Sequence, residues 1–344
     1  LADAVLLDSA GLSILQRLQV DDRKPGTGCK LTWDLQDVRT TFCYLAVSDY
    51  AMNTAIYKVD LSDLNLGYEP NAFYGYMEGQ GTSGWMSFAE DSPERPVLLT
   101  TTERAYRAAE YVDGCVYAVT SGNELVAMKF GEFLPAKVGA ITLSESSLHW
   151  EFSTTTEILD MAYDYSTKTM YAIGLTRLND FVVNVFLYTV DLDTGECTQV
   201  GKSWISGSTG KGVAALACDL EGNLYCVDRG TLSANLYKLE LTDDDLYCKE
   251  IGNTGVFSYT SAQSMAFDHN RGCLYYYPYP NSESQNPYQH NLIQVDLETG
   301  KGTVLGAIGG QKTYGLYIPY DRDPLEKSAE RISLPETGWQ FEGQ

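Results

Sequence analysis

Short runs of apolar residues, separated by turns rich in Gly and Asp, recur along most of this chain. The stretch 161–201, MAYDYSTKTMYAIGLTRLNDFVVNVFLYTVDLDTGECTQVG, is typical of four such strands. Similar stretches begin at Leu216 and Met265, a degraded copy begins at Ala109, and a lone first strand begins at Gly315. These starts are spaced by 52, 55, 49 and 50 residues. A four-stranded repeat of about fifty residues predicts the blades of a β-propeller.

The number of blades depends on two less regular stretches. TFCYLAV and TAIYKVDL, at 41–61, match the second and third strands of the repeat, and the lone strand at 315–321 can supply the missing first strand. This pairing would close the ring by joining the C-terminal strand to N-terminal strands, which removes open edges. FYGYMEG, GWMSFAED and PVLLTTT, between Phe73 and Thr102, predict another blade. We therefore expect an all-β propeller of six four-stranded blades, with five or seven as alternatives.

Three segments are expected along the chain. Residues 1–28 form a lead-in segment, 29–322 the propeller, and 323–344 a charged linker with a tail. The tail, RISLPETGWQFEGQ, resembles the opening strand of bacterial Ig-like group 2 domains in its I-x-L start and later G-Q. The alternative is a tail that lies along the propeller. Leu1 opens the chain without Met, which a removed signal peptide or excision from a longer protein would explain.

Charge and cysteine content narrow the class of protein. The formal net charge of −22 argues against nucleic acid and anionic lipid as partners, because both would be repelled. No apolar run is long enough for a transmembrane helix. The eight cysteines include no C-x-x-C, and Cys115 and Cys273 occupy equivalent places in two copies. We expect small core thiols rather than disulfides, since a Cys218–Cys226 bridge across one hairpin would be strained.

The two faces of the predicted propeller differ in their loops. With the strands of a blade named A to D from the axis outward, the A–B and C–D turns are short and regular: DLEGN, DHNRG, DLDTGE and DLETGK. Turn geometry explains their Asp and Gly residues. DLDTGE also resembles a calcium loop, but it lacks the remaining ligands of an EF-hand. The D–A and B–C connections on the other face are longer and richer in aromatic residues.

We expect ligand contacts on this D–A/B–C face, because binding groups concentrate on loops of a rigid scaffold. Aromatic side chains beside Asn, Gln, Arg and Asp suit sugar rings or peptide side chains. The alternative for each aromatic residue is packing between neighbouring blades. The expected ligand-binding residues are Tyr106, Arg107, Asp160, Arg177, Trp204, Arg229, Tyr259, Tyr279, His290 and Tyr314.

The motifs D-x-x-G-x-L-Y and L-Y-x-V-D-L-x-T-G resemble those of extracytoplasmic bacterial propellers of the YVTN, NHL and SMP-30 type, over about residues 37–322. The resemblance implies a fold more than a function, because such proteins include binding modules, lactonases and scaffold proteins. Lactonase-type members hold a metal with acids and an Asn at the axis, and this sequence does not match them residue by residue. The sialidase Asp-box and the G-x-S-x-G elbow are also absent.

These observations favour a monomeric, non-catalytic binding module of a secreted or cell-surface bacterial protein. It would recognise a glycan or a protein, without nucleic-acid partners or direct membrane insertion. We expect no catalytic residue, no metal ligand and no cofactor, and leave open a structural or channel-bound calcium ion. One alternative is a hydrolase, lyase or lactonase with Asp160 and Asp228 at the channel mouth. Another is a structural spacer or assembly module.

Overall fold

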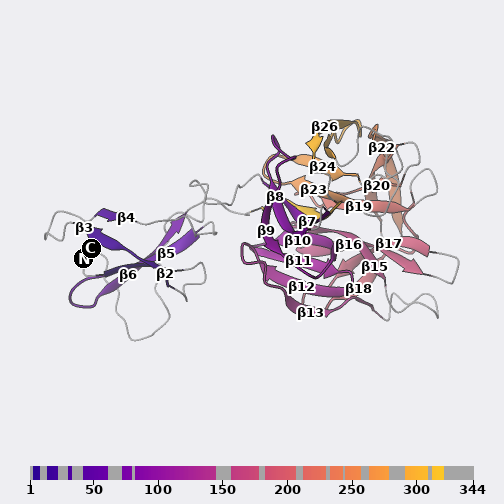
Figure 1. Ribbon diagram of the computed structural model, residues 1–344. Helices are drawn as coiled ribbons and strands as arrows, with labels where there is room; N and C mark the ends of the chain where they lie inside the picture. Colours follow the sequence, from indigo (N-terminus) through magenta and orange to yellow (C-terminus); the bar gives the residue numbers. More distant parts are fainter. Residues whose placement is uncertain are drawn as a thin grey trace. The chain divides into compact units, whose positions relative to one another are not determined.

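The structure is a computed structural model, and all secondary structure in its described residues is β-strand. The all-β prediction is therefore confirmed, and no described segment forms a helix that could cross a membrane. The chain divides into two compact units: unit 1 is Leu1–Pro70 with Asp321–Gln344, and unit 2 is Asn71–Tyr320 (Figure 1). The described residues are 3–7, 14–21, 30–32, 42–60, 72–79, 82–144, 156–177, 183–206, 212–229, 233–242, 245–256, 263–278, 291–308 and 312–320.

Unit 1 has a sheet of its own, in the order β2-β1-β5-β6, and a separate pair of strands, β3 and β4. The strands are β1 (Asp3–Leu7), β2 (Ile14–Arg17), β3 (Gln19–Asp21), β4 (Lys30–Thr32), β5 (Phe42–Ser48) and β6 (Thr54–Asp60). The expected pairing of the strands at 41–61 with the strand at 315–321 is wrong, because β5 pairs with β1 and β6. A pattern of apolar positions indicates that a strand is half-buried, but it does not determine which other strand pairs with it.

Unit 2 contains four four-stranded antiparallel sheets and a fifth sheet in which β14 adds a parallel strand beside β18. Their orders are β27-β7-β8-β9, β10-β11-β12-β13, β14-β18-β17-β16-β15, β19-β20-β21-β22 and β23-β24-β25-β26. The first group is β7 (Phe73–Gly79), β8 (Thr82–Phe88), β9 (Val97–Thr101) and β27 (Lys312–Tyr317). The others are β10 (Tyr106–Val112), β11 (Cys115–Thr120), β12 (Glu124–Lys129), β13 (Ala136–Ala140), β14 (Thr142–Leu143), β15 (Glu157–Asp164), β16 (Thr169–Arg177), β17 (Val183–Val190), β18 (Glu196–Val200), β19 (Val213–Cys218), β20 (Leu224–Asp228), β21 (Asn235–Leu241), β22 (Leu246–Asn253), β23 (Ser264–Asp268), β24 (Cys273–Tyr277), β25 (Asn291–Val295) and β26 (Gly302–Ala307).

The five sheets follow the predicted repeat and pack face to face. Their first strands are neighbours in the cyclic order β27, β10, β15, β19, β23 and again β27. Four clusters of buried apolar side chains each lie between two successive sheets. Small inner-strand residues such as Ala162, Ala215 and Ala266 are buried, as strands crowded at an axis require. The arrangement is consistent with the predicted β-propeller.

The sheet that contains β27 meets the sheet β10–β13 through aromatic side chains. The ring of Trp85 lies 5.0 Å from that of Tyr106 and 6.0 Å from that of Phe133, measured between centroids. Trp85 is only 1% exposed, so this interface between the two sheets is buried from solvent. Close to it, Gly315 has a φ of +54°, and a Cβ there would lie 2.3 Å from the backbone nitrogen of Ala109. Glycine is required where β27 approaches β10 so closely.

The D-x-x-T-G turns join neighbouring sheets as well as neighbouring strands. In the turn between β17 and β18, the carbonyl of Thr194 approaches Gly139 of β13, where a Cβ would lie 1.8 Å from that oxygen. The turn between β25 and β26 repeats the arrangement, because a Cβ on Gly252 of β22 would lie 2.1 Å from the carbonyl oxygen of Thr299. The glycine that ends each copy of the repeat therefore receives the turn of the next sheet.

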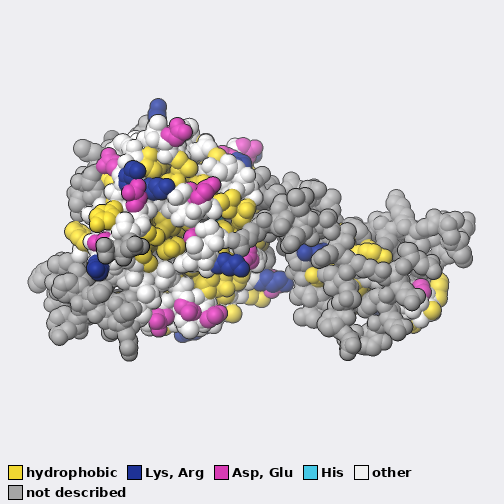
Figure 2. All heavy atoms as spheres, turned by 180° about the vertical axis from the view of Figure 1, so that it is seen from behind, with side chains coloured by type: hydrophobic (Ala, Val, Ile, Leu, Met, Phe, Trp, Pro, Cys, Tyr) yellow, Lys and Arg dark blue, Asp and Glu magenta, His cyan; other side chains and the backbone are white. Residues whose placement is uncertain are grey.

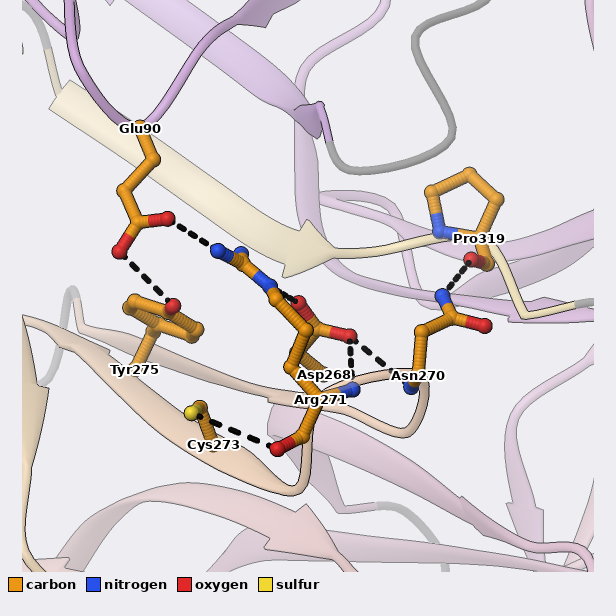
Figure 3. A network of polar contacts seen from close by, with 7 residues as sticks. All are labelled: Glu90, Asp268, Asn270, Arg271, Cys273, Tyr275 and Pro319. Atoms are coloured by element: carbon orange, nitrogen blue, oxygen red, sulfur yellow. Dashed lines mark hydrogen bonds and ion pairs between the residues drawn. The ribbon is translucent and has the colours of Figure 1, made fainter. Parts of the chain in front are cut away.

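A polar network ties the sheet β23–β26 to the connection between β8 and β9. Arg271 donates from Nε to Asp268 Oδ2 at 2.5 Å and forms an ion pair with Glu90 (Figure 3). The hydroxyl of Tyr275 donates to the other Glu90 oxygen at 3.0 Å, and Asn270 donates to the carbonyl of Pro319 at 3.4 Å. Two segments about 180 residues apart in sequence are thereby joined.

The cysteines are small side chains within the sheets. The seven described cysteines are free thiols, and Cys29 lies outside the described residues. Cys115 and Cys273 both begin the second strand of their sheets, as the repeat predicted. Cys218 faces Leu224 in the β19–β20 register rather than Cys226, so the hairpin does not align these two thiols.

Candidate ligand-binding site

A pocket of about 270 Å³ opens where the D–A and B–C connections leave three neighbouring sheets of unit 2. It is a small pocket, just below the roughly 300–1,000 Å³ typical of sites for drug-sized ligands. It lies on the face that the sequence predicts to bind a ligand. Its walls come from β7, from the starts of β10, β15 and β27, and from the β11–β12 turn: Glu78, Ala105, Tyr106, Arg107, Ser121, Glu157, Ile158, Leu159 and Tyr314.

Bulges at the starts of the inner strands shape this pocket. In β10, Tyr106 pairs with Thr120 and Ala108 with Val119, which leaves Arg107 without a register partner. Leu159 is the extra residue at the equivalent place in β15. A bulge re-aims the side chains around it, and such features are common next to binding and catalytic sites. Arg107 and Leu159 both line the pocket.

Arg107 and Glu157 form an ion pair across the first strands of two sheets. Their side chains are 31% and 49% exposed, so the pair faces the pocket opening with hydrogen-bonding capacity to spare. Glu78, on β7, accepts a hydrogen bond from the Tyr76 hydroxyl at 3.1 Å. The wall therefore combines two carboxylates, one guanidinium and the hydroxyl of Ser121.

Tyr106 and Tyr314 form the aromatic part of the wall. Tyr106 is 2% exposed, and its ring lies 5.3 Å from that of Tyr76. Burial raises the pKa of Tyr106. Tyr106 therefore mainly packs between neighbouring sheets, which was the alternative to ligand contact for the aromatic residues. Tyr314 is half-buried and more open to a ligand.

Asp160 lies three residues beyond Glu157 on β15 and is fully buried. Its Oδ2 accepts backbone N–H groups from Leu216 at 3.0 Å and Met265 at 3.1 Å, and its Oδ1 accepts the Ser264 hydroxyl at 3.1 Å. Burial raises its pKa to about 8, although these hydrogen bonds act in the opposite direction. Both oxygens are engaged in joining inner strands, so Asp160 is not part of the pocket wall.

Glu110 lies on β10, three residues beyond Arg107. Burial of its carboxyl group, together with the nearby charge of Asp160, raises its pKa to about 8. Backbone N–H groups of Tyr111 and Tyr163 act in the opposite direction. Each of the two inner strands thus carries a charged residue at the pocket and an acid three residues further along.

Other predicted contacts lie away from the pocket or outside the description. Trp204 is 47% exposed, and the two residues before it donate backbone N–H groups to Asp245 between β21 and β22. Arg229 donates to the carbonyl of Gly212, and burial lowers its pKa. Neither residue lines the pocket. Tyr259, Tyr279 and His290 lie outside the described residues, as does the side chain of Arg177, the last residue of β16.

Asp228, which the hydrolase alternative pairs with Asp160, forms hydrogen bonds within its own sheet. Its Oδ1 accepts the backbone N–H of Asn235 at 2.7 Å, and its Oδ2 accepts the Tyr237 hydroxyl at 3.2 Å. In the part of the chain that the structure describes, no group of three or more His, Cys, Asp or Glu side chains could hold a metal ion. A channel-bound calcium ion therefore has no evident ligand set among these residues.

The sequence interpretation missed Glu78, Glu157, Ser121 and Glu110. The sequence contained one usable signal, because R-A-A-E at 107–110 and E-I-L-D at 157–160 both lie at the start of a first strand. Both segments place a charged residue three positions before an acid at the start of a first strand. No comparable signal in the sequence pointed to Glu78, because β7 lies in the least regular copy of the repeat.

Comparisons with known proteins add little about function. No protein-family model matches the chain, and no curated protein sequence matches it. Similar solved structures include a luciferin-regenerating enzyme, at 11% identity and a TM-score of 0.38, covering 78% of this chain and 75% of that one. A GH43_1 enzyme from Xanthomonas citri with xylotriose has 13% identity and a TM-score of 0.40, over 60% and 74% of the two chains. A putative TolB from Agrobacterium tumefaciens has 8% identity and a TM-score of 0.39, over 71% and 97%. At such scores these likenesses carry no argument about what this chain binds.

Proposed function

We propose that this chain is the non-catalytic binding module of a secreted or cell-surface bacterial protein and that unit 2 holds one ring of a glycan in its pocket. In this proposal unit 2 is a five-bladed propeller, closed by the pairing of β27 with β7. The observation that carries the proposal is the pocket wall itself. It joins an accessible Arg107–Glu157 pair to the half-buried ring of Tyr314 within a volume suited to a single ring.

The chemistry of this wall suits a sugar. A guanidinium donates hydrogen bonds and a carboxylate accepts them, so Arg107 and Glu157 together can satisfy neighbouring hydroxyl groups of a polyol. The face of Tyr314 offers apolar area to the C–H groups of the ring, and its hydroxyl gives it a polar end. The walls belong to paired strands and tight turns, which limits the ordering that binding requires.

Binding measurements can test this proposal on the full chain. Mono- and oligosaccharides would be titrated against the protein and followed by ligand-observed NMR and calorimetry. We expect Tyr314→Ala and Arg107→Met each to weaken binding by roughly tenfold or more. Trp204→Ala is the matched control, since it removes an exposed aromatic residue outside the pocket. Binding that survives both pocket variants, or that depends on Trp204, would contradict the proposed site.

A glycoside hydrolase is the second candidate, favoured by the interacting carboxyl groups of Glu110 and Asp160. Such enzymes use two carboxyl groups that flank the scissile bond. Asp160 suits this role less well, because three hydrogen bonds to β19 and β23 already occupy both of its oxygens. Release of nitrophenol from chromogenic glycosides, abolished by Glu110→Gln, would establish the enzyme and exclude a purely binding function.

A protein ligand remains the other outcome of the binding experiments. If no sugar binds but a protein partner is captured by the wild type and lost with Tyr314→Ala, the same face serves a protein. Monomeric state, location outside the cell, and the lack of nucleic-acid or membrane partners stay predictions. Light scattering and cell fractionation can test the first two.

A further inference from the structure

Glu78 is the pocket carboxylate whose charge is not balanced by a partner. The ion pairs of the described residues include Arg107 with Glu157, and none of them involves Glu78. Its Oε1 accepts a hydrogen bond from the hydroxyl of Tyr76, and no other described side chain donates to Glu78. An ionised carboxylate can accept about four hydrogen bonds. Glu78 therefore brings both an uncompensated charge and unused acceptor capacity to the pocket wall.

The nearest basic residue in the sheet register does not line the pocket. Lys312 of β27 is the register partner of Glu78 across β7. Its side chain is exposed, and it is not part of the pocket wall. The wall itself contains two carboxylates and one guanidinium, which leaves one negative charge. A lysine outside the wall weakens the local potential without filling the space in front of Glu78.

The negative net charge of the whole chain also favours a cationic ligand over a neutral or anionic one. At a net charge of −22 the protein repels anions and raises the local concentration of cations near its clefts. A neutral sugar would hydrogen-bond to Glu78 without compensating its charge. A ligand with an ammonium group would do both, and hydrogen bonds between two charged groups are the strong ones. The half-buried ring of Tyr314, which shares the pocket wall with Glu78, adds a favourable face for a cation.

We propose that the ligand of this pocket carries a protonated amine and that Glu78 binds it, so that the ligand is an amino sugar. The inference rests on the proposed function and specifies its ligand. The ammonium group lies at Glu78, the ring lies against Tyr314, and the hydroxyl groups meet the Arg107–Glu157 pair. N-acetylation of the amine removes the charge and abolishes the preference.

Three sugars that differ at one position test this inference. Glucosamine, N-acetylglucosamine and glucose would be titrated at pH 6, where a primary amine is protonated. We expect glucosamine to bind roughly tenfold or more tightly than the other two, with a preference that added salt reduces. Glu78→Gln should remove the preference. Glu94→Gln makes the same change of charge outside the pocket, next to Arg95, and should retain it.

The possible outcomes separate this inference from the proposed function. Equal binding of the three sugars, lost with Tyr314→Ala, would overturn the role of the amine and leave the glycan site standing. Glucosamine preference that persists in Glu78→Gln would overturn the assignment of Glu78. Failure of all three sugars and of the wider glycan panel to bind would overturn both proposals. Circular dichroism of the Gln variants checks that they fold.

Discussion

Asp160 is the side chain whose loss should most weaken the packing of the inner strands of unit 2. Its carboxyl group joins β15 to β19 through the N–H of Leu216 and to β23 through the N–H of Met265 and the hydroxyl of Ser264. The oxygen of that hydroxyl accepts the N–H of Leu316 at 2.8 Å, which extends the connection to β27. Four of the five first strands therefore meet around one buried acid, and Asp160→Ala removes it.

The expected cost follows from the groups left behind. The N–H groups of Leu216 and Met265 would be buried without an acceptor, at about 1–3 kcal/mol each. The Ser264 hydroxyl loses its acceptor as well, so the free energy of unfolding should fall by about 3–6 kcal/mol. Domains of this kind have about 5–15 kcal/mol in total, so the loss would be a large part of the stability. Asp296→Ala is the control, since Asp296 also accepts three hydrogen bonds but lies in an exposed turn.

Urea unfolding followed by tryptophan fluorescence, to which the buried Trp85 contributes, would measure this difference. Hydrogen exchange of the Leu216 and Met265 amides gives a local readout, because both should exchange faster in Asp160→Ala and not in Asp296→Ala. The reasoning is refuted if the two variants lose equal stability, or if the two amides remain as protected as in the wild type.

The pH dependence provides a separate test of Asp160. Its folded pKa of about 8 lies above the ordinary aspartate value of 3.8, so the folded state binds more protons between these pH values. Stability from this group is therefore present below about pH 4 and is lost as pH rises through about 8, with a slope of up to about 1.4 kcal/mol per pH unit. Asp160→Asn does not titrate. The stability of the wild type relative to Asp160→Asn should thus fall as pH rises from 4 to 8, and a rise would contradict the assignment.

Two further contacts between sheets can be tested by urea unfolding. Gly139→Ala should cost about 1–3 kcal/mol, because its Cβ would lie 1.8 Å from the carbonyl oxygen of Thr194. Gly122→Ala, with its nearest atom at 3.7 Å, is the control, and a similar loss in both would contradict this reasoning. Arg271→Met should cost about 1–3 kcal/mol, since it leaves the buried carboxylate of Asp268 without its cation. A Met variant as stable as the wild type would show that Asp268 is satisfied by its backbone donors alone.

The repeat and the strands of unit 2 could be predicted because their signals are local. Turns such as D-L-D-T-G-E and D-L-E-T-G-K fold by hydrogen bonds over two or three residues, and Gly195 and Gly300 adopt the positive φ that such turns need. The face that carries the pocket also followed from the repeat, since the short turns must all emerge on the other side. Arg107 and Tyr314 were expected there, and both line the pocket.

The pairing of β5 with β1, rather than with the strand at 315–321, could not be predicted in the same way. Their apolar pattern fits the second and third strands of a blade and equally fits a sheet with β1. When two strands are far apart in the sequence, whether they pair depends on which surfaces the rest of the fold buries. The local sequence pattern does not contain this information. The choice was therefore made by tertiary packing.

The sequence by itself determined the all-β class, the fifty-residue repeat and the short Asp- and Gly-containing turns of one face. Each of these depends on residues a few positions apart. Tertiary structure alone decided that Glu78, Arg107 and Glu157 share one pocket, because they lie on three different sheets and Arg107 is the extra residue of a bulge. It also gave Asp160 a structural role, since its hydrogen-bond partners lie 56 and more residues away. Such contacts depend on how the sheets pack around the axis, and that packing is a property of the whole unit.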